Sequence, residues 1–312
     1  MTMGFLSKAR KARGQKPTKL TKEEAAKLKS SQREIDIKKH ESADKEEVDT
    51  FAKEVSISGT KAHKPISKNP GKISFLPARV SKFDELITAK GLERGSTMLV
   101  SGGAGTGKTT FCMQALYEGA LKGEKGIYIS LEEDVDRIKA HMLNNYKWDF
   151  AKLEKKGLIA FLKFDAIEIA RVVEAMILKE KEKLVIDFGT LDLPFKPDRL
   201  VVDSLSALSI AFENTDSYRK YIRYLFEKLE ENNSVNFMLS ETTQDPKVYS
   251  KAGIEEFLAD GVIVLYNIQV DNIRENALEI LKLRSSKHEK KIVPFKITDG
   301  GLEIYPNEEI FN

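Results

Sequence analysis

The chain has 312 residues, of which 41% are hydrophobic and 32% charged, so it can bury a substantial core. No apolar run approaches the ~18–20 residues that span a bilayer, and the first residues contain no apolar stretch of secretory length, so we expect a cytoplasmic protein. A single cysteine, Cys112, excludes an internal disulfide and a cysteine-based zinc site.

Charge is distributed unevenly along the chain. Residues 1–72 contain 18 Lys and Arg and 10 Asp and Glu, a balance of +8 in a chain whose formal net charge is +3. Apolar residues are sparse there, so we expect a basic, largely disordered N-terminal arm with one solvated helix over about 21–39. Such an arm either only aids solubility or contacts DNA or an anionic surface.

Residues 73–312 read as one α/β domain. Apolar runs at 97–100, 126–130, 158–162, 200–202, 235–239 and 262–265 are predicted strands, and helical patterns fill most of the gaps between them. This alternation predicts a mostly parallel sheet with helices on both faces. The last apolar segments, 278–283, 292–297 and 302–305, are separated only by short polar breaks, so we expect an antiparallel extension of the sheet.

A phosphate-binding motif lies between the first of these strands and a helical pattern. Gly102-Gly-Ala-Gly-Thr-Gly-Lys-Thr109 matches G-x-x-x-x-G-K-[ST]. The glycines let backbone N–H groups approach phosphate oxygens, and the positive end of the following helix adds to the attraction. Lys108 is expected to reach the β- and γ-phosphates of ATP, and the Thr109 hydroxyl to bind Mg²⁺. The predicted nucleotide contacts are Gly105, Thr106, Gly107, Lys108, Thr109 and Thr110.

A site of this kind also needs a carboxylate at the end of a buried strand to hold the metal. Asp187 and Asp203 both follow apolar runs, at 184–186 and 200–202. We favour Asp203 because the residues after it allow a passage from strand to helix. Asp187 would then belong to a loop ahead of that strand.

Hydrolysis requires a group that activates water and positive charge on the transition state. Glu132 and Glu133 are placed at the end of the strand that follows the phosphate-binding helix. As adjacent residues of an extended strand they point to opposite faces, so that one faces the γ-phosphate. The alternative is that both cap a helix beginning near Asp134. Lys282 and Arg284 share one face of a predicted strand, where they are either solvated or reach a neighbouring subunit's nucleotide.

At these residues the chain resembles the KaiC family of RecA-like ATPases, in its single-domain, archaeal-type form, over about residues 74–306. The segments that carry the resemblance are GTGKTT (105–110), ISLEE (129–133), WD (148–149), VVDSLSAL (201–208), GIEEFLADGVIVL (253–265), LEILKLR (278–284) and PFKITD (294–299). The ordered set is far more specific than the phosphate-binding motif alone.

The resemblance implies a RecA-like core that assembles into rings, commonly hexameric, with ATP between subunits. It implies that the water-activating residue belongs to the pair Glu132 and Glu133, and that Ser240 and Thr242 lie where a sensor reads the γ-phosphate. The residues that it assigns to the neighbour's nucleotide, or to positions near it, are Lys282, Arg284, His288, Thr298 and Asp299.

The chain departs from the family pattern at two places. Ser285-Ser286 replace the usual Gly-Thr, and Glu256-Phe257 occupy the place of the clock protein's phosphorylated Ser-Thr pair, so self-phosphorylation is not expected there. We therefore expect a slow, Mg²⁺-dependent ATPase that acts as a switch or assembly regulator for an unknown protein partner. Two alternatives stay open: an ATP-sensing scaffold without significant turnover, and a recombinase-like DNA-binding ATPase.

Overall fold

The computed structural model describes residues 73–179, 193–242 and 249–310. The predicted arm (1–72), its helix over 21–39 and Asp187 lie outside the described residues. The division into arm and domain and the role of the arm therefore stay predictions. No helix in the described ranges combines the length and apolar character needed to cross a membrane.

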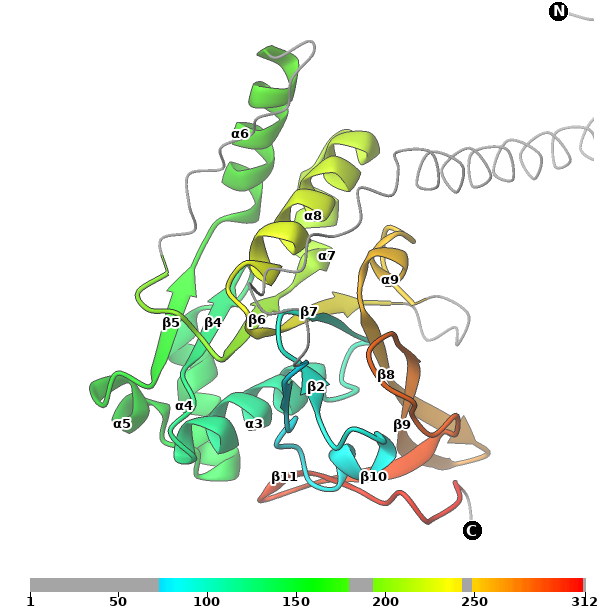
Figure 1. Ribbon diagram of the computed structural model, residues 1–312. Helices are drawn as coiled ribbons and strands as arrows, with labels where there is room; N and C mark the ends of the chain where they lie inside the picture. The colour runs from blue at the N-terminus through cyan, green and yellow to red at the C-terminus, as the bar shows by residue number, and fades with distance from the viewer. Residues whose placement is uncertain (1–72, 180–192, 243–248, 311–312) are drawn as a thin grey trace, which may run out of the picture. The chain divides into compact units, whose positions relative to one another are not determined.

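The described residues form a nine-stranded mixed sheet in the order β11-β10-β9-β8-β3-β7-β6-β4-β5 (Figure 1). Its parallel strands are β3 (Thr97–Gly102), β4 (Gly126–Ser130), β5 (Ile159–Lys163), β6 (Arg199–Asp203), β7 (Val235–Glu241) and β8 (Gly261–Val270). Strands β9 (Ile273–Leu283), β10 (Val293–Thr298) and β11 (Gly301–Ile304) extend it in antiparallel fashion. The predicted fold class, a mostly parallel sheet with an antiparallel C-terminal extension, is confirmed.

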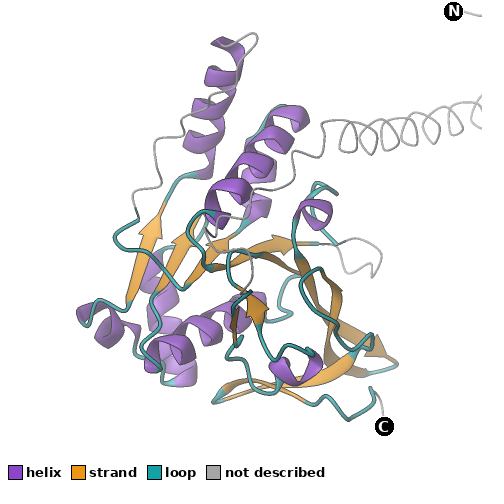
Figure 2. Cartoon of the chain, in the orientation of Figure 1, coloured by secondary structure: helices purple, strands orange, loops and turns teal. Residues whose placement is uncertain are grey.

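Helices cover both faces of the sheet (Figure 2). One face packs against α3 (Lys108–Leu121), α4 (Val135–Tyr146), α5 (Phe150–Lys155) and the 3₁₀ helix η1 (Phe83–Leu86). The other packs against α6 (Ala166–Lys179), α7 (Leu205–Ala211) and α8 (Thr215–Glu230), while α9 (Glu255–Leu258) precedes β8. The alternation of side chains along β3 explains the two cores, because Met98 and Val100 lie in one and Leu99 in the other.

Two features were missed by the sequence patterns. A small sheet pairs β1 (Phe75–Leu76) with β2 (Leu92–Glu93), and strands of two residues leave no periodicity to read. The β8–β9 hairpin is also longer than its apolar runs, 262–265 and 278–283, because polar residues continue the pairing up to Val270 and Ile273. The Cys112 side chain is fully buried in α3.

Candidate functional site

The phosphate-binding loop runs from the end of β3 to the start of α3, at the edge where β4, β6 and β7 also end. Gly107 precedes the helix with φ 90°, a left-handed conformation that favours glycine, and a Cβ there would lie 3.1 Å from Ile297 Cδ1. Gly105 has φ 76°, and a Cβ added to it would meet no atom of the described chain within 4 Å. The outer side of the loop is therefore open to a ligand.

Lys108 lies across its own loop. Its side chain is 7% exposed, and Nζ donates to the carbonyls of Gly102 at 2.9 Å and Gly103 at 3.0 Å. Burial lowers the pKa of Lys108, an effect that the carboxylates of Glu241 and Asp203 oppose. Glu241 Oε1, at the end of β7, is 3.8 Å from this ammonium group. The sequence reasoning did not single out Glu241, although it lies two residues after the predicted strand 235–239.

Asp203 ends β6 and contacts the loop, as expected of the residue favoured over Asp187. Its Oδ2 accepts hydrogen bonds from Thr109 Oγ1 at 2.9 Å and from the Tyr128 hydroxyl at 2.6 Å. Burial raises the pKa of Asp203, and the hydrogen bonds from Tyr128 and Thr109 oppose that rise. Tyr128, on β4, was missed because its partner lies 75 residues away in sequence.

The donor set suits nucleotide-bound Mg²⁺. Proteins hold this ion with one or two carboxylates together with phosphate oxygens, and Asp203 and Thr109 offer a carboxylate and a hydroxyl side by side. Within the described ranges, no group of three or more His, Cys, Asp or Glu residues is arranged to hold a metal ion. Phosphate oxygens of the nucleotide would complete the coordination.

Glu132 and Glu133 lie in a bend after β4, which ends at Ser130, so the expectation of an extended strand at this pair is wrong. The cap of α4 is Asp134, whose carboxylate accepts from Arg137 N at 3.0 Å, so neither glutamate serves as that N-cap. Ser204 Oγ donates to Glu132 Oε1 at 3.1 Å. Desolvation raises the pKa of Glu132, and the nearby Asp203 carboxylate adds to the rise.

These side chains surround a cavity of about 310 Å³. It is lined by Thr109, Thr110, Tyr128, Ser130, Glu132, Glu133, His141, Met142, Asn145, Tyr146, Asp203 and Glu241. Sequence reasoning missed the face of α4, although the spacing 141, 142, 145 and 146 places those residues on one side of a helix. The cavity thus joins the loop, the Asp203 carboxylate and both glutamates.

The two sensor candidates flank a residue that reaches the cavity. Ser240 is fully buried, and its Oγ accepts from Lys251 N at 3.4 Å. Thr242 N donates to the carbonyl of Gly102 at 3.2 Å. Glu241, between them, lines the cavity. The sensor role of Ser240 and Thr242 stays a prediction.

Lys282 and Arg284 lie towards the opposite end of the strands from the loop. Lys282 pairs with Val262, and Val262 pairs with Leu99 of β3. Gly102, where the loop begins, is three residues further along β3, about 10 Å at ~3.3 Å per residue, and β9 is two strands away from β3. These cations therefore do not face their own loop.

Both cations bind the end of α9. Lys282 Nζ donates to the carbonyls of Glu256, Phe257 and Ala259 at 3.0, 3.3 and 2.6 Å. Arg284 Nη2 donates to the Phe257 carbonyl at 3.1 Å, and its side chain is 53% exposed. Burial, with the nearby charge of Arg284, lowers the pKa of Lys282 to about 8. The predicted sharing of one face is confirmed by this common partner.

The remaining residues predicted to reach a neighbour's nucleotide, or to lie near it, are in two places. The backbone of His288 forms an isolated antiparallel β-bridge with Ile87. The buried Nε2 of His288 has no hydrogen-bond partner within the described part of the chain. Thr298 ends β10, Asp299 begins the turn to β11, and the preceding Ile297 lies against the chain's own Gly107. Their roles toward a nucleotide stay predictions.

Comparison with known proteins indicates the family of this chain. The family model described as "ATPase: KaiC" matches residues 76–309. The circadian clock oscillator protein KaiC of Parathermosynechococcus lividus is 33% identical over 227 residues, which cover 71% of this chain and 41% of that protein. The corresponding protein of Synechococcus elongatus is 30% identical and is matched over 82% of this chain and 48% of its own length. This chain thus spans less than half of these relatives.

One solved structure is matched by this chain over the whole length of that structure. The crystal structure of a KaiC-like protein from Pyrococcus horikoshii OT3 matches with a TM-score of 0.62 and 32% identity, covering 75% of this chain and 100% of that one. The family match, the relatives and this structure all indicate a KaiC-like ATPase domain. The chain belongs to the KaiC family of RecA-like ATPases.

Proposed function

We propose that this chain is a slow, Mg²⁺-dependent cytoplasmic ATPase that holds ATP between subunits and acts as a switch or assembly regulator for a protein partner. The observation that carries the proposal is the position of Lys282 and Arg284, which lie at the other end of the strands from their own phosphate-binding loop. Cations placed there serve a nucleotide only if another copy presents its loop to them.

The charge of the cavity supports a contribution from a second copy. Glu132, Glu133, Asp203 and Glu241 line it, and the ammonium group of Lys108 lies 3.8 Å from Glu241 Oε1. ATP adds further negative charge, which grows on the transferring phosphoryl group. Bound Mg²⁺ would neutralise part of it, and an arginine supplied in trans is worth 10³–10⁵ in rate in related enzymes.

The residues of the loop's own subunit take separate roles in the proposal. Backbone N–H groups of the loop and Lys108 bind the phosphates, while Thr109 and Asp203 hold the metal. Glu132 accepts the proton of the attacking water, because its raised pKa suits a base and Ser204 orients its carboxylate. Self-phosphorylation at Glu256-Phe257 is not part of the proposal, because neither side chain has a hydroxyl group.

The test is the ATPase rate per subunit as a function of protein concentration. We expect a rate that rises with concentration, reaches a plateau, and falls about 10³-fold or more in Arg284→Ala. Arg274→Ala is the matched control, because Arg274 lies at the other end of β9, where it donates to Asn267 Oδ1 at 2.8 Å. A near-zero rate at every concentration, with ATP bound tightly, would refute the ATPase and favour the ATP-sensing scaffold.

A further inference from the structure

Glu241 is a carboxylate of the nucleotide cavity to which the proposed mechanism gives no role. It ends β7, and its backbone is held on both sides. Glu241 pairs with Gly102, where the phosphate-binding loop begins, and its N–H donates to Ser206 Oγ at 2.7 Å. Its side chain, by contrast, is 53% exposed. The carboxylate can therefore change its partner without disturbing the sheet.

The partner of this carboxylate is the lysine of the phosphate-binding motif. An ammonium group has three N–H donors, and Lys108 directs two of them to the carbonyls of Gly102 and Gly103. Glu241 Oε1 lies 3.8 Å from Lys108 Nζ. Burial lowers the pKa of Lys108, and among the carboxylates that oppose this effect Glu241 acts most strongly. Glu241 is thus the counter-charge that the chain itself supplies to Lys108.

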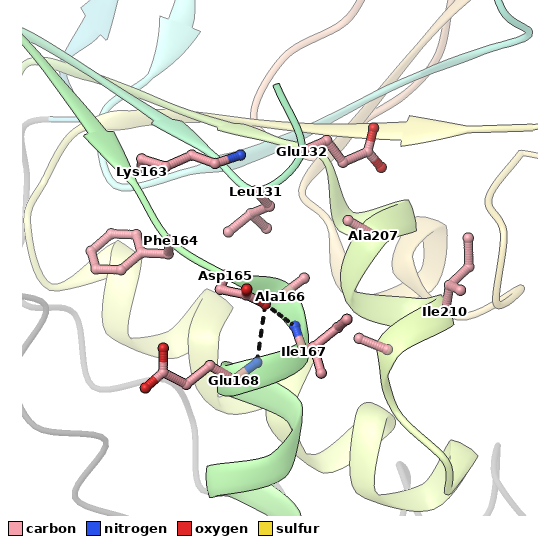
Figure 3. A pocket seen from close by; sticks show the side chains of 11 residues that line it. Leu131, Glu132, Lys163, Phe164, Asp165, Ala166, Ile167, Glu168, Ala207 and Ile210 are labelled. Atoms are coloured by element: carbon pink, nitrogen blue, oxygen red, sulfur yellow. Dashed lines mark hydrogen bonds between the residues drawn. The ribbon is translucent and has the colours of Figure 1, made fainter. Parts of the chain in front are cut away.

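Other carboxylates of the cavity have other partners. Asp203 accepts two hydrogen bonds from side chains of the cavity wall. Glu132 accepts one from Ser204 and lies at the boundary with a second hollow, of about 920 Å³, between the end of β5, α6 and α7 (Figure 3). Among the described residues, the carboxylate that forms an ion pair with Lys108 is therefore that of Glu241.

A bound γ-phosphate would meet both members of this ion pair. The motif's lysine binds the β- and γ-phosphates. A phosphate oxygen about 2.9 Å from Lys108 Nζ lies at most ~7 Å from Glu241 Oε1. Like charges at that distance in a partly buried site lower the affinity on the order of tenfold. Mg²⁺ offsets the charge of the triphosphate, so this cost falls mainly on metal-free ATP.

We propose that Glu241 is a specificity-determining residue that competes with the γ-phosphate for Lys108 and so makes tight ATP binding depend on Mg²⁺. The selected ligand is the Mg²⁺ complex of a nucleoside triphosphate, and the rejected one is the metal-free anion. The proposal rests on the proposed function, in which the site binds ATP with Mg²⁺, and it adds the residue that excludes ATP without the metal.

The affinity for ATP with and without the metal tests this role. Titration calorimetry measures Kd for ATP in excess Mg²⁺ and in EDTA, for the native full chain, Glu241→Gln and Glu241→Asp. We expect Glu241→Gln to bind metal-free ATP about tenfold more tightly than the native chain does, and Mg²⁺–ATP to within about threefold of the native affinity. Glu241→Asp keeps the charge, so its ratio of the two Kd values should stay within about threefold of the native ratio.

Glu303→Gln is the matched control. It removes the charge of a glutamate on β11 whose Oε1 lies 3.9 Å from Lys82 Nζ and whose side chain is 41% exposed, values close to those of Glu241. Glu303 lies outside the set of residues that line the cavity. Both affinities of this variant should therefore equal the native ones.

The possible outcomes separate this proposal from the proposed function. An equal ratio of the two Kd values in the native chain and Glu241→Gln overturns the role of Glu241 and leaves the ATPase standing. A loss of about tenfold or more in Mg²⁺–ATP affinity in Glu241→Gln also overturns it, because the carboxylate would then hold the metal. The expected shift without turnover in any chain supports the role of Glu241 and refutes the ATPase, since binding is measured apart from hydrolysis. A native chain that binds ATP in neither condition overturns both.

Discussion

Replacing Tyr128 by Phe tests how the metal carboxylate is held. The Tyr128 hydroxyl donates to Asp203 Oδ2 at 2.6 Å, and Thr109 Oγ1 donates to the same oxygen at 2.9 Å. A hydrogen bond to a charged group contributes roughly 1.5–3 kcal/mol, and we take about 1.5 kcal/mol because Thr109 remains as a donor. The Mg²⁺-dependent part of ATP binding should therefore weaken about tenfold.

The same substitution should change the pH dependence of binding. The hydrogen bond from Tyr128 opposes the rise that burial causes in the pKa of Asp203, so its loss raises that pKa further. A carboxyl group with a higher pKa is protonated at less acidic pH. The defect of Tyr128→Phe should therefore grow as the pH falls from neutral.

The assay is a titration with Mg²⁺ at fixed ATP, followed by the fluorescence of a labelled ATP analogue. Tyr146→Phe is the matched control, because that hydroxyl lies in the same cavity but 3.4 Å from Thr110 Oγ1 and not on Asp203. Equal Mg²⁺ midpoints for the native protein and Tyr128→Phe, with both chains folded, would refute the role assigned to this hydrogen bond.

Three further substitutions address parts of the fold that support the site. Arg199→Met should lower the free energy of unfolding by about 1–3 kcal/mol in a urea titration, because Arg199 is 1% exposed and its loss leaves the Glu124 carboxylate with the partly exposed Arg79, 2.9 Å away, as its ion-pair partner. An unchanged urea midpoint would contradict this. Gly107→Ala should lower the free energy of unfolding by about 1–2 kcal/mol, because the left-handed φ of this residue is strained for alanine. Calorimetry should detect no ATP binding to this variant; binding would show that the loop accepts a side chain. The pKa of Lys282 is about 8 in the native protein against 10.5 in the unfolded chain, so the unfolded chain binds more protons between these values. As the pH rises from about 7.5 to about 9.5, the native protein should therefore gain stability relative to Lys282→Met. A difference in urea midpoint that stays constant over that range would show that Lys282 does not titrate there.

Features that depend on a short stretch of chain were predictable from the sequence. The loop from Gly102 to Thr109 lies between a strand and a helix as its motif requires, because the conformation needed is written in adjacent residues. Alternating apolar runs likewise predicted the parallel strands and the antiparallel end of the sheet. The choice of Asp203 followed from the same local pattern, and its carboxylate contacts Thr109.

Features that depend on strand order were not predictable. Glu241 reaches the cavity because β7 lies next to β3, and Tyr128 reaches Asp203 because β4 lies next to β6, and neither neighbour is consecutive in the chain. The bend at Glu132 and Glu133 similarly ended the extended strand that the sequence pattern suggested.

The sequence by itself determined the phosphate-binding loop, the fold class and the residue types available for hydrolysis. Only the tertiary structure decided that Lys282 and Arg284 lie at the opposite end of the strands from that loop, and that Tyr128 and Glu241 reach the nucleotide cavity. The physical reason is that backbone conformation follows from neighbouring residues. The place of a side chain in the sheet follows instead from the pairing of strands that are far apart in sequence.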